Sequence, residues 1–146
     1  MKPTTGRQIL SFLGVFTVLF DLSAEANATH VWNQTIEPHA RFHIVWQLAS
    51  NCMLVFAALA LVWTGRTDDV NRVRLAAILL SLEPIGFSFA SFTRHSYGGT
   101  YFPANVPDYD ISVAGIPIAL LVFVSLGVAQ AAVGVSVQDA LGAKAC

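Results

Sequence analysis

Carboxyl groups inside apolar segments are the residues of this chain that are best suited to chemistry. Glu83 lies near the middle of the apolar run 75–92, and Asp21 lies in another apolar run near the amino terminus. An acid at bilayer depth costs several kcal/mol, so it usually faces a bundle interior or a water-filled cavity. In a medium of low dielectric one carboxyl group can stay protonated and donate a proton, while a second one stays ionised and acts as a base. We therefore expect Asp21 and Glu83 to form a catalytic acid–base pair.

Polar side chains also recur every four positions along two apolar segments, and residues at this spacing share one side of a helix. Glu25 comes four residues after Asp21, and the second segment carries the series His39, His43, Gln47 and Asn51. We expect both stripes and Glu83 to face one polar cavity. Glu25 and the two histidines would move protons or orient water, and the two amides would bind a substrate carbonyl or hydroxyl. The alternative is a network that only fixes helix register.

The connection 94–110 is too aromatic for a simple spacer and too rich in Gly and Pro for a helix. We expect it to cap the outer mouth of the cavity, where His95, Tyr97 and Tyr101 would contact the substrate. Anchoring of the tyrosines at the membrane interface is an equally good interpretation. Arg41 would orient a substrate oxygen or hold a carboxylate in its ionised form, unless its side chain simply extends to the headgroups.

A metal site is the alternative to acid–base chemistry. His39 and His43 share a helix face. One of the acids inside the apolar segments, Asp21, Glu25 or Glu83, could complete a set of metal ligands. The zinc-protease pattern, however, requires a Glu beside the first His within the helix, whereas here Glu37 precedes Pro38. The chain also has no phosphate loop, nucleophile elbow, haem attachment motif or dinucleotide fingerprint. We assign no metal and no cofactor, and the question of a metal near the two histidines stays open.

The composition is typical of an integral membrane protein, because 55% of the 146 residues are hydrophobic and only 12% are charged. A hydrocarbon core about 30 Å thick needs roughly 20 mainly apolar residues per helix. Four stretches meet this requirement, and we predict an all-α, four-helix membrane bundle that forms one domain, 1–146. The expected helices are 8–25, 42–63, 73–93 and 111–137. The last of them is rich in small residues, which let helices pack closely in lipid.

The positive charges predict the orientation of the helices. Of the eight Lys and Arg residues, two lie in the first and third connections, Arg41 and Arg94. The other six lie in the termini and the second connection: Lys2, Arg7, Arg66, Arg72, Arg74 and Lys144. This bias places both termini on the cytoplasmic side, in the endoplasmic reticulum membrane of a eukaryote or the inner membrane of a bacterium. A net charge of −1 argues against a nucleic-acid partner.

A short signature in this chain resembles one that recurs in other proteins. His30-Val-Trp-Asn, followed by Glu-Pro-His-Ala-Arg-Phe-His at 37–43, is similar to a signature of short four-helix membrane proteins, mostly uncharacterised and DoxX-like in size. More faintly, the chain length and the carboxylate placement resemble small membrane enzymes of fungal polyketide and terpenoid pathways. That resemblance implies an epoxide hydrolase or a cyclase that uses an acid–base carboxylate pair.

Three functions fit these observations. The first is an intramembrane acid–base enzyme that opens an epoxide, cyclises or isomerises an apolar small molecule of polyketide or terpenoid type. The second is a small proton-coupled transporter or ligand-binding membrane protein in which Glu83 titrates. The third is a structural or assembly subunit of a membrane complex. The expected partners are an apolar substrate and the lipid bilayer, and the sequence leaves room for a homo-oligomer.

Overall fold

The computed structural model describes residues 5–64, 69–101, 112–113, 115–117, 120 and 122–145. The described chain is almost entirely helical. Its elements are α1 (Thr5–Glu25), α2 (Pro38–Thr64), α3 (Val70–Thr93), the 3-10 turn η1 (Arg94–Ser96), the strands β1 (Ser112–Val113) and β2 (Ile116–Pro117), and α4 (Val122–Ala145). By length and composition α1, α2 and the segment Val70–Ser96 can each cross a membrane, and α4 contains a shorter apolar helix, Phe123–Gln138.

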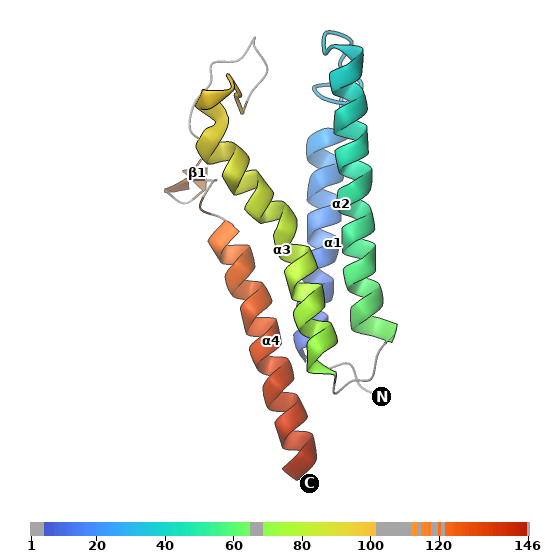
Figure 1. The fold of residues 1–146 in the computed structure, drawn as a ribbon, viewed down its shortest axis with the longest axis vertical. Coiled ribbons are helices and arrows are strands. Elements are labelled where there is room, and N and C mark those ends of the chain that lie inside the picture. The colour runs from blue at the N-terminus through green and yellow to red at the C-terminus, as the bar shows by residue number, and fades with distance from the viewer. Residues whose placement is uncertain are drawn as a thin grey trace.

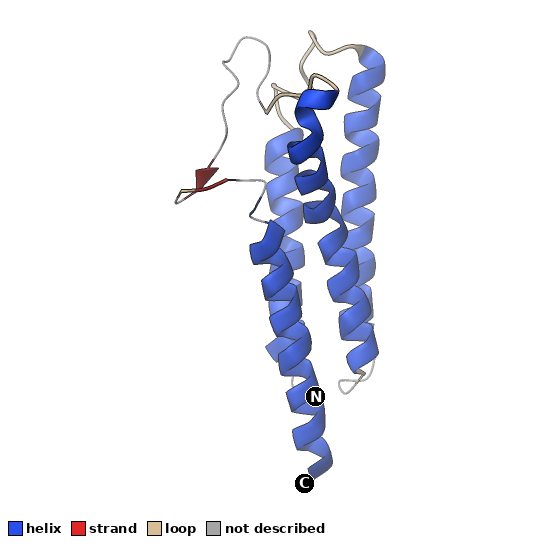
Figure 2. Cartoon of the chain, turned by 60° about the vertical axis from the view of Figure 1, so that its left-hand side comes forward, coloured by secondary structure: helices blue, strands red, loops and turns tan. Residues whose placement is uncertain are grey.

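The four helices pack side by side. α1 contacts α2, α3 and α4, and α3 contacts α2 and α4. The beginning of α1 and the end of α4 lie at the same end of the molecule, called here the terminal end (Figure 1). A second view, turned by 60°, shows the two short strands beside the start of α4 (Figure 2). The architecture is consistent with a helical membrane protein.

The predicted start of the fourth helix, at residue 111, is wrong. Ser112 pairs with Pro117 and Val113 pairs with Ile116 in an antiparallel hairpin, and α4 begins only at Val122. Gly115 has a φ of 77°, which residues other than glycine rarely adopt, and Pro117 cannot donate a helical hydrogen bond. These two residues stop the helix from extending toward its amino terminus, although the segment is apolar throughout.

Local sequence determines where α2 and α3 begin. α2 starts at Pro38, a residue suited to the first helical turn, and the Oε2 atom of Glu37 accepts a hydrogen bond of 3.0 Å from the amide of Ala40. α3 is capped by Asp69, whose side chain accepts a hydrogen bond from the amide of Arg72. Such caps satisfy amides that have no partner within the helix. Both starts therefore lie a few residues earlier than the hydrophobic pattern alone predicts.

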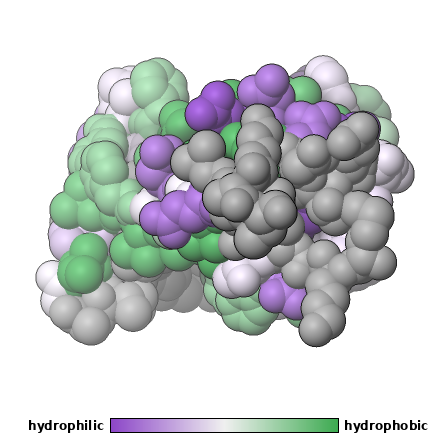
Figure 3. Space-filling view, turned by 90° about the horizontal axis from the view of Figure 1, so that it is seen from below, coloured by the Kyte–Doolittle hydropathy of each residue, from purple (hydrophilic) through white to green (hydrophobic). Residues whose placement is uncertain are grey.

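The surface that the helices leave uncovered is apolar. Phe12, Phe16 and Phe20 stack along one face of α1, with ring centroids 6.4 and 6.3 Å apart, and each ring is more than half exposed. Viewed from the terminal end, apolar side chains form one flank of the molecule, while hydrophilic ones gather nearer the middle (Figure 3). An exposed apolar face of this extent suits acyl chains better than water.

The tightest packing lies in the half of the molecule near the terminal end. The fully or nearly buried apolar residues are Leu10, Val55, Ala58, Val62, Val73, Ala76, Ala77, Leu80, Ala129 and Ala132. A Cβ atom added at Gly6 would overlap Ser136 Oγ and the backbone carbonyl of Ala132, and one at Gly14 would lie 3.1 Å from Val55 Cγ1. Glycine thus lets α1 approach α4 and α2 closely, as in other membrane helix pairs.

We expect Gly6→Ala to destabilise the protein by about 1–3 kcal/mol, the usual cost of overpacking, because the clash involves backbone and cannot be relieved by side-chain rotation alone. The matched control is Gly127→Ala on α4, where an added Cβ meets nothing within 4 Å. There the gain in helix propensity should stabilise the protein slightly. Unfolding of both variants in detergent micelles measures the difference, and equal stabilities would contradict close packing of α1 against α4.

Candidate functional site

A cavity of about 570 Å³ lies between α1, α2 and α3, in the half of the molecule away from the terminal end. Its polar lining residues are Asp21, Glu25, His30, Gln47, Asn51, Glu83 and Tyr101, and the rest of the lining is apolar or small. Within the described residues α4 contributes nothing to this lining. The cavity has the size of a pocket for a small molecule, mostly apolar with a few polar groups that fix orientation.

The carboxyl groups of Asp21 and Glu83 meet at the inner end of this cavity. Asp21 is only 6% exposed and Glu83 is half-buried, and their side chains lie close enough to interact with each other. When one of the two groups holds a proton, it can donate a hydrogen bond to the other, because a carboxyl group has a hydrogen to donate whereas a carboxylate only accepts. Asp21 Oδ2 and Glu83 Oε2 are buried without a hydrogen-bond partner. The geometry thus brings two acids from different helices together at the base of a largely apolar cavity.

The sequence of α3 explains how Glu83 reaches this position. Pro84 follows it within the helix, and a proline supplies no amide hydrogen for the carbonyl four residues earlier, here that of Leu80. Beyond this point the upper half of α3 leans away from α1 and α2 (Figure 1). Gly86 adds no side chain on the cavity side, and a Cβ placed there would meet nothing within 4 Å. The cavity therefore opens where α3 loses one backbone hydrogen bond.

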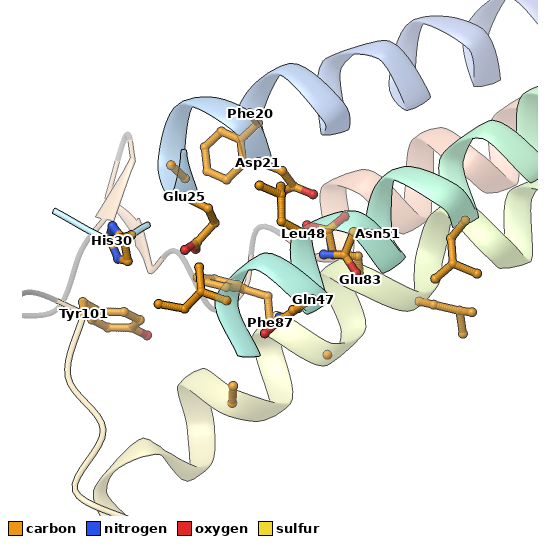
Figure 4. A pocket seen from close by; sticks show the side chains of 16 residues that line it. Phe20, Asp21, Glu25, His30, Gln47, Leu48, Asn51, Glu83, Phe87 and Tyr101 are labelled. Carbon is orange, nitrogen blue, oxygen red and sulfur yellow. The ribbon is translucent and has the colours of Figure 1, made fainter. Parts of the chain in front are cut away.

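Amide and apolar groups surround the acid pair. Asn51 from α2 lies close to Glu83, with Asp21 of α1 facing them, so that three helices contribute to the inner end (Figure 4). Gln47, one turn earlier on α2, also lines the cavity. An amide can donate and accept hydrogen bonds at once. Asn51 and Gln47 are therefore suited to holding a carbonyl, hydroxyl or water near the two acids.

The outer end of the cavity carries Glu25, His30 and Tyr101 (Figure 4). The ring of Tyr101 stacks on that of Phe87, with centroids 6.5 Å apart, and Arg94 Cζ lies 4.5 Å from the centroid of the Tyr101 ring. A guanidinium over an aromatic face is attractive, so Tyr101 is held between α3 and the cavity mouth. This part of the predicted cap does border the cavity, whereas its remainder, 102–110, lies outside the described residues.

A chain of hydrogen bonds selects one tautomer of the neutral His30 ring. The Nδ2 atom of Asn27 donates to the carbonyls of Ser23 and Ala24, so its Oδ1 atom is the acceptor that faces Thr29. The amide and the hydroxyl of Thr29 both donate to that oxygen. Because the hydrogen of the Thr29 hydroxyl is used in this bond, Thr29 Oγ1 accepts a hydrogen bond of 2.9 Å from His30 Nδ1. The neutral imidazole then carries its hydrogen on Nδ1, and Nε2 is left as a base.

The structure brings together part of the predicted site. The predicted residues that line the cavity are Asp21, Glu25, Gln47, Asn51, Glu83 and Tyr101; those that do not are His39, His43, Arg41, His95 and Tyr97. Only the later half of the predicted polar stripe on α2 lines the cavity, and the reason is geometric. A step of four residues turns the helix by about 400°, so the stripe drifts about 40° per step. His43 is thus rotated by roughly 80° and His39 by roughly 120° from Asn51.

The remaining predicted residues have other environments. Arg41 Nη1 donates to Gln34 Oε1 at 3.5 Å, and the hydroxyl of Tyr97 donates to the carbonyl of Ala90 at 2.9 Å. His95 is exposed on η1. Their predicted contact with substrate is therefore not supported by their positions. His30, by contrast, lines the cavity although no periodic pattern includes it, and only its place between the ends of α1 and α2 could have suggested it.

A metal site at the acid pair would need at least one further ligand beside Asp21 and Glu83. Within the described residues no three His, Cys, Asp or Glu side chains are grouped so that they could hold a metal ion.

In comparisons with protein-family models, curated proteins and solved structures, no family model, curated protein or structure matches this chain. The resemblance of the segment 30–43 to other membrane proteins thus remains a prediction, and the function is argued from the cavity.

We expect Glu83→Gln to raise the free energy of unfolding by about 1 kcal/mol, because it removes one of two neighbouring acids and its amide can donate to the Asp21 carboxylate. Asn51→Asp places a third acid near the pair and should lower that free energy by about 1–3 kcal/mol. Unfolding in detergent micelles measures both changes. Glu25→Gln at the outer end is the control and should stay within about 0.5 kcal/mol. If Glu83→Gln instead destabilised the protein strongly, the pair would be a structural network.

Proposed function

We propose that this protein is an intramembrane acid–base enzyme that acts on an apolar small molecule by opening an epoxide, with hydrolysis or cyclisation as the outcome, or by isomerisation. The observation that carries the proposal is the pair of neighbouring acids, Asp21 and Glu83, at the inner end of a largely apolar cavity. Buried acceptors without partners cost stability, and such groups are retained mainly where they have a role. A purely structural contact between helices has no need of two acids.

The pair can both give and take a proton within one catalytic cycle. In epoxide opening the protonated carboxyl donates its hydrogen to the epoxide oxygen while the C–O bond breaks. Its partner removes a proton from the water that adds to the carbon, or, in a cyclisation, from the carbon skeleton after ring closure. The proton count of the pair is unchanged, but the proton now sits on the other residue. Asp21 and Glu83 lie close together, so a hydrogen bond between them would be the path by which it returns.

The apolar surroundings of the acid pair favour an apolar substrate. Phe20, Leu48 and Phe87 line the cavity, and side chains of this kind bind hydrocarbon and exclude bulk water, which strengthens electrostatic interactions inside. A polyketide- or terpenoid-like molecule with one or two oxygens fits such walls. Asn51 and Gln47 would hold the reacting oxygen, and His30 Nε2 would accept a hydrogen bond from a hydroxyl group of the substrate at the outer end.

The proposed setting is a four-helix bundle in the membrane with both termini on the cytoplasmic side, supported by the charge bias of the connections. The terminal end, with its tightly packed apolar core, would then face the cytoplasm. The cavity would lie in the outer half of the bilayer, where an apolar substrate dissolved in lipid can enter from the side. The phenylalanine face of α1, exposed next to the cavity, would be in contact with acyl chains.

A turnover assay tests the proposal. Membranes that contain the wild-type chain, incubated with a panel of terpenoid and polyketide epoxides in ¹⁸O-labelled water, should yield labelled diols or unlabelled cyclic products. Asp21→Asn and Glu83→Gln should each lower the rate by about 10²- to 10⁴-fold, the usual contribution of a positioned acid or base. Mass spectrometry of the products measures both effects.

The matched control for these variants is Glu37→Gln, which changes an exposed acid outside the cavity in the same way. Wild-type rates in both cavity variants would contradict an acid–base role. Uptake of an unchanged compound into sealed vesicles that requires a proton gradient would assign the same cavity to transport instead.

The hydrogen-bond chain that orients His30 gives a second test. Thr29→Val removes the hydroxyl that accepts from Nδ1, so we expect KM for a hydroxylated substrate to rise about tenfold, the effect of a lost hydrogen bond worth about 1–1.5 kcal/mol. Thr35→Val is the matched control, because the amide and hydroxyl of Thr35 donate to Asn33 Oδ1 in the same way but neither Thr35 nor Asn33 lines the cavity. ¹⁵N shifts of the His30 ring should show loss of the Nδ1–H form only in Thr29→Val. An unchanged ring tautomer would contradict the role of the chain.

A further inference from the structure

A second group of titratable side chains lies outside the cavity, on the first two turns of α2. His39 and His43 are both exposed, and their Nε2 atoms are 3.1 Å apart. The two rings meet edge to face, with centroids 4.6 Å apart. Neither residue lines the cavity, so the proposed acid–base chemistry makes no use of them.

The separation of the two nitrogens is the one that a shared metal ion requires. Imidazole nitrogens bind first-row metals such as zinc at about 2.0–2.1 Å. With those bond lengths a nitrogen separation of 3.1 Å corresponds to an angle of roughly 95–100° at the metal, between the values for octahedral and tetrahedral coordination. The same separation also fits a hydrogen bond between the two nitrogens, and a bound metal ion would replace the hydrogen of that bond.

Neighbouring aromatic side chains hold the two imidazole rings in place. The ring of His39 stacks on Phe42 at 6.3 Å, and the ring of His43 lies 5.7 Å from Phe42 and 5.7 Å from Trp46. Packing of this kind limits ring rotation, so less conformational entropy is lost when both nitrogens bind one ion. Arg41 lies two residues from each histidine and therefore on another side of the helix, where its charge is directed toward Gln34.

We propose that His39 and His43 form a surface site for a divalent transition-metal ion of the Ni²⁺, Cu²⁺ and Zn²⁺ class, for which imidazole is a preferred ligand. Within the described residues no third His, Cys, Asp or Glu joins the pair in a metal-binding group. Water or an external donor completes the coordination, so the site is open on its outer side. The inference is independent of the proposed enzymatic function, because it rests on residues outside the cavity.

Titration of the full-length chain with Cu²⁺ tests the site, with protein purified in detergent micelles without a polyhistidine tag. Trp46 lies beside His43, so bound Cu²⁺ should quench its fluorescence, and Zn²⁺ should reverse the quenching by competition. Electron paramagnetic resonance of the bound Cu²⁺ should show two imidazole nitrogens. His39→Ala and His43→Ala should each weaken Cu²⁺ binding by about 10- to 100-fold, because the second ligand then no longer binds as an intramolecular group.

The sharpest control keeps the number of histidines constant. Ala40→His combined with His43→Ala places the two imidazoles on adjacent residues, which do not face each other on a helix, and should weaken binding as much as the single variants. His95→Ala removes an exposed histidine elsewhere and should leave Cu²⁺ affinity unchanged. Circular dichroism confirms that each variant keeps its helices. Equal affinity of the wild type and the Ala40→His/His43→Ala variant, or a signal from only one nitrogen, would overturn the proposal.

Discussion

The contact between Asp21 and Glu83 is the constraint on which the rest of the structure depends. Two acids from different helices can be kept side by side among apolar residues only if other interactions offset the cost of removing them from water. The packed core supplies these interactions in the half of the molecule near the terminal end, where Gly6 and Gly14 allow close helix contact. The residues that stabilise the protein and the residues of the proposed site thus lie in different halves of the same helices. This separation lets the site keep buried acids that would destabilise a uniformly packed core.

The transition between these halves occurs within α3. Up to Leu80 its buried apolar residues belong to the core. From Leu82 onward one face of the helix lines the cavity, with Leu82, Glu83, Gly86, Phe87 and Ala90. Pro84 lies at this boundary, and the loss of one backbone hydrogen bond is a sufficient cause for the altered helix course. The change from core to cavity thus coincides with the position of the proline in α3.

The sequence alone predicted the helical class, and it predicted that Asp21 and Glu83 would lie together. A polar residue within an apolar run can be recognised whichever side of the helix it occupies. The sequence placed Gln47 and Asn51 on the side of α2 that lines the cavity. It also extended this stripe to His43 and His39, which the drift of about 40° per step turns away from the cavity. The predicted start of α4 was wrong because the hydropathy of a segment does not reveal a turn such as the one at Gly115. His30 could not be found by periodicity, since a loop has none and its place depends on tertiary contacts.

The segment 30–43, which resembles a signature of other membrane proteins, divides into two parts with different positions. His30 is turned toward the cavity and its ring is fixed by Thr29, whereas the phase of α2 directs His39 and His43 outward. A recurring signature of this kind is easily taken as one ligand set, yet the helix that starts at Pro38 separates its histidines between an inner and an outer surface. Removal of His30 and removal of the outer pair should therefore have separable effects, the first on the cavity and the second on the exposed face of α2.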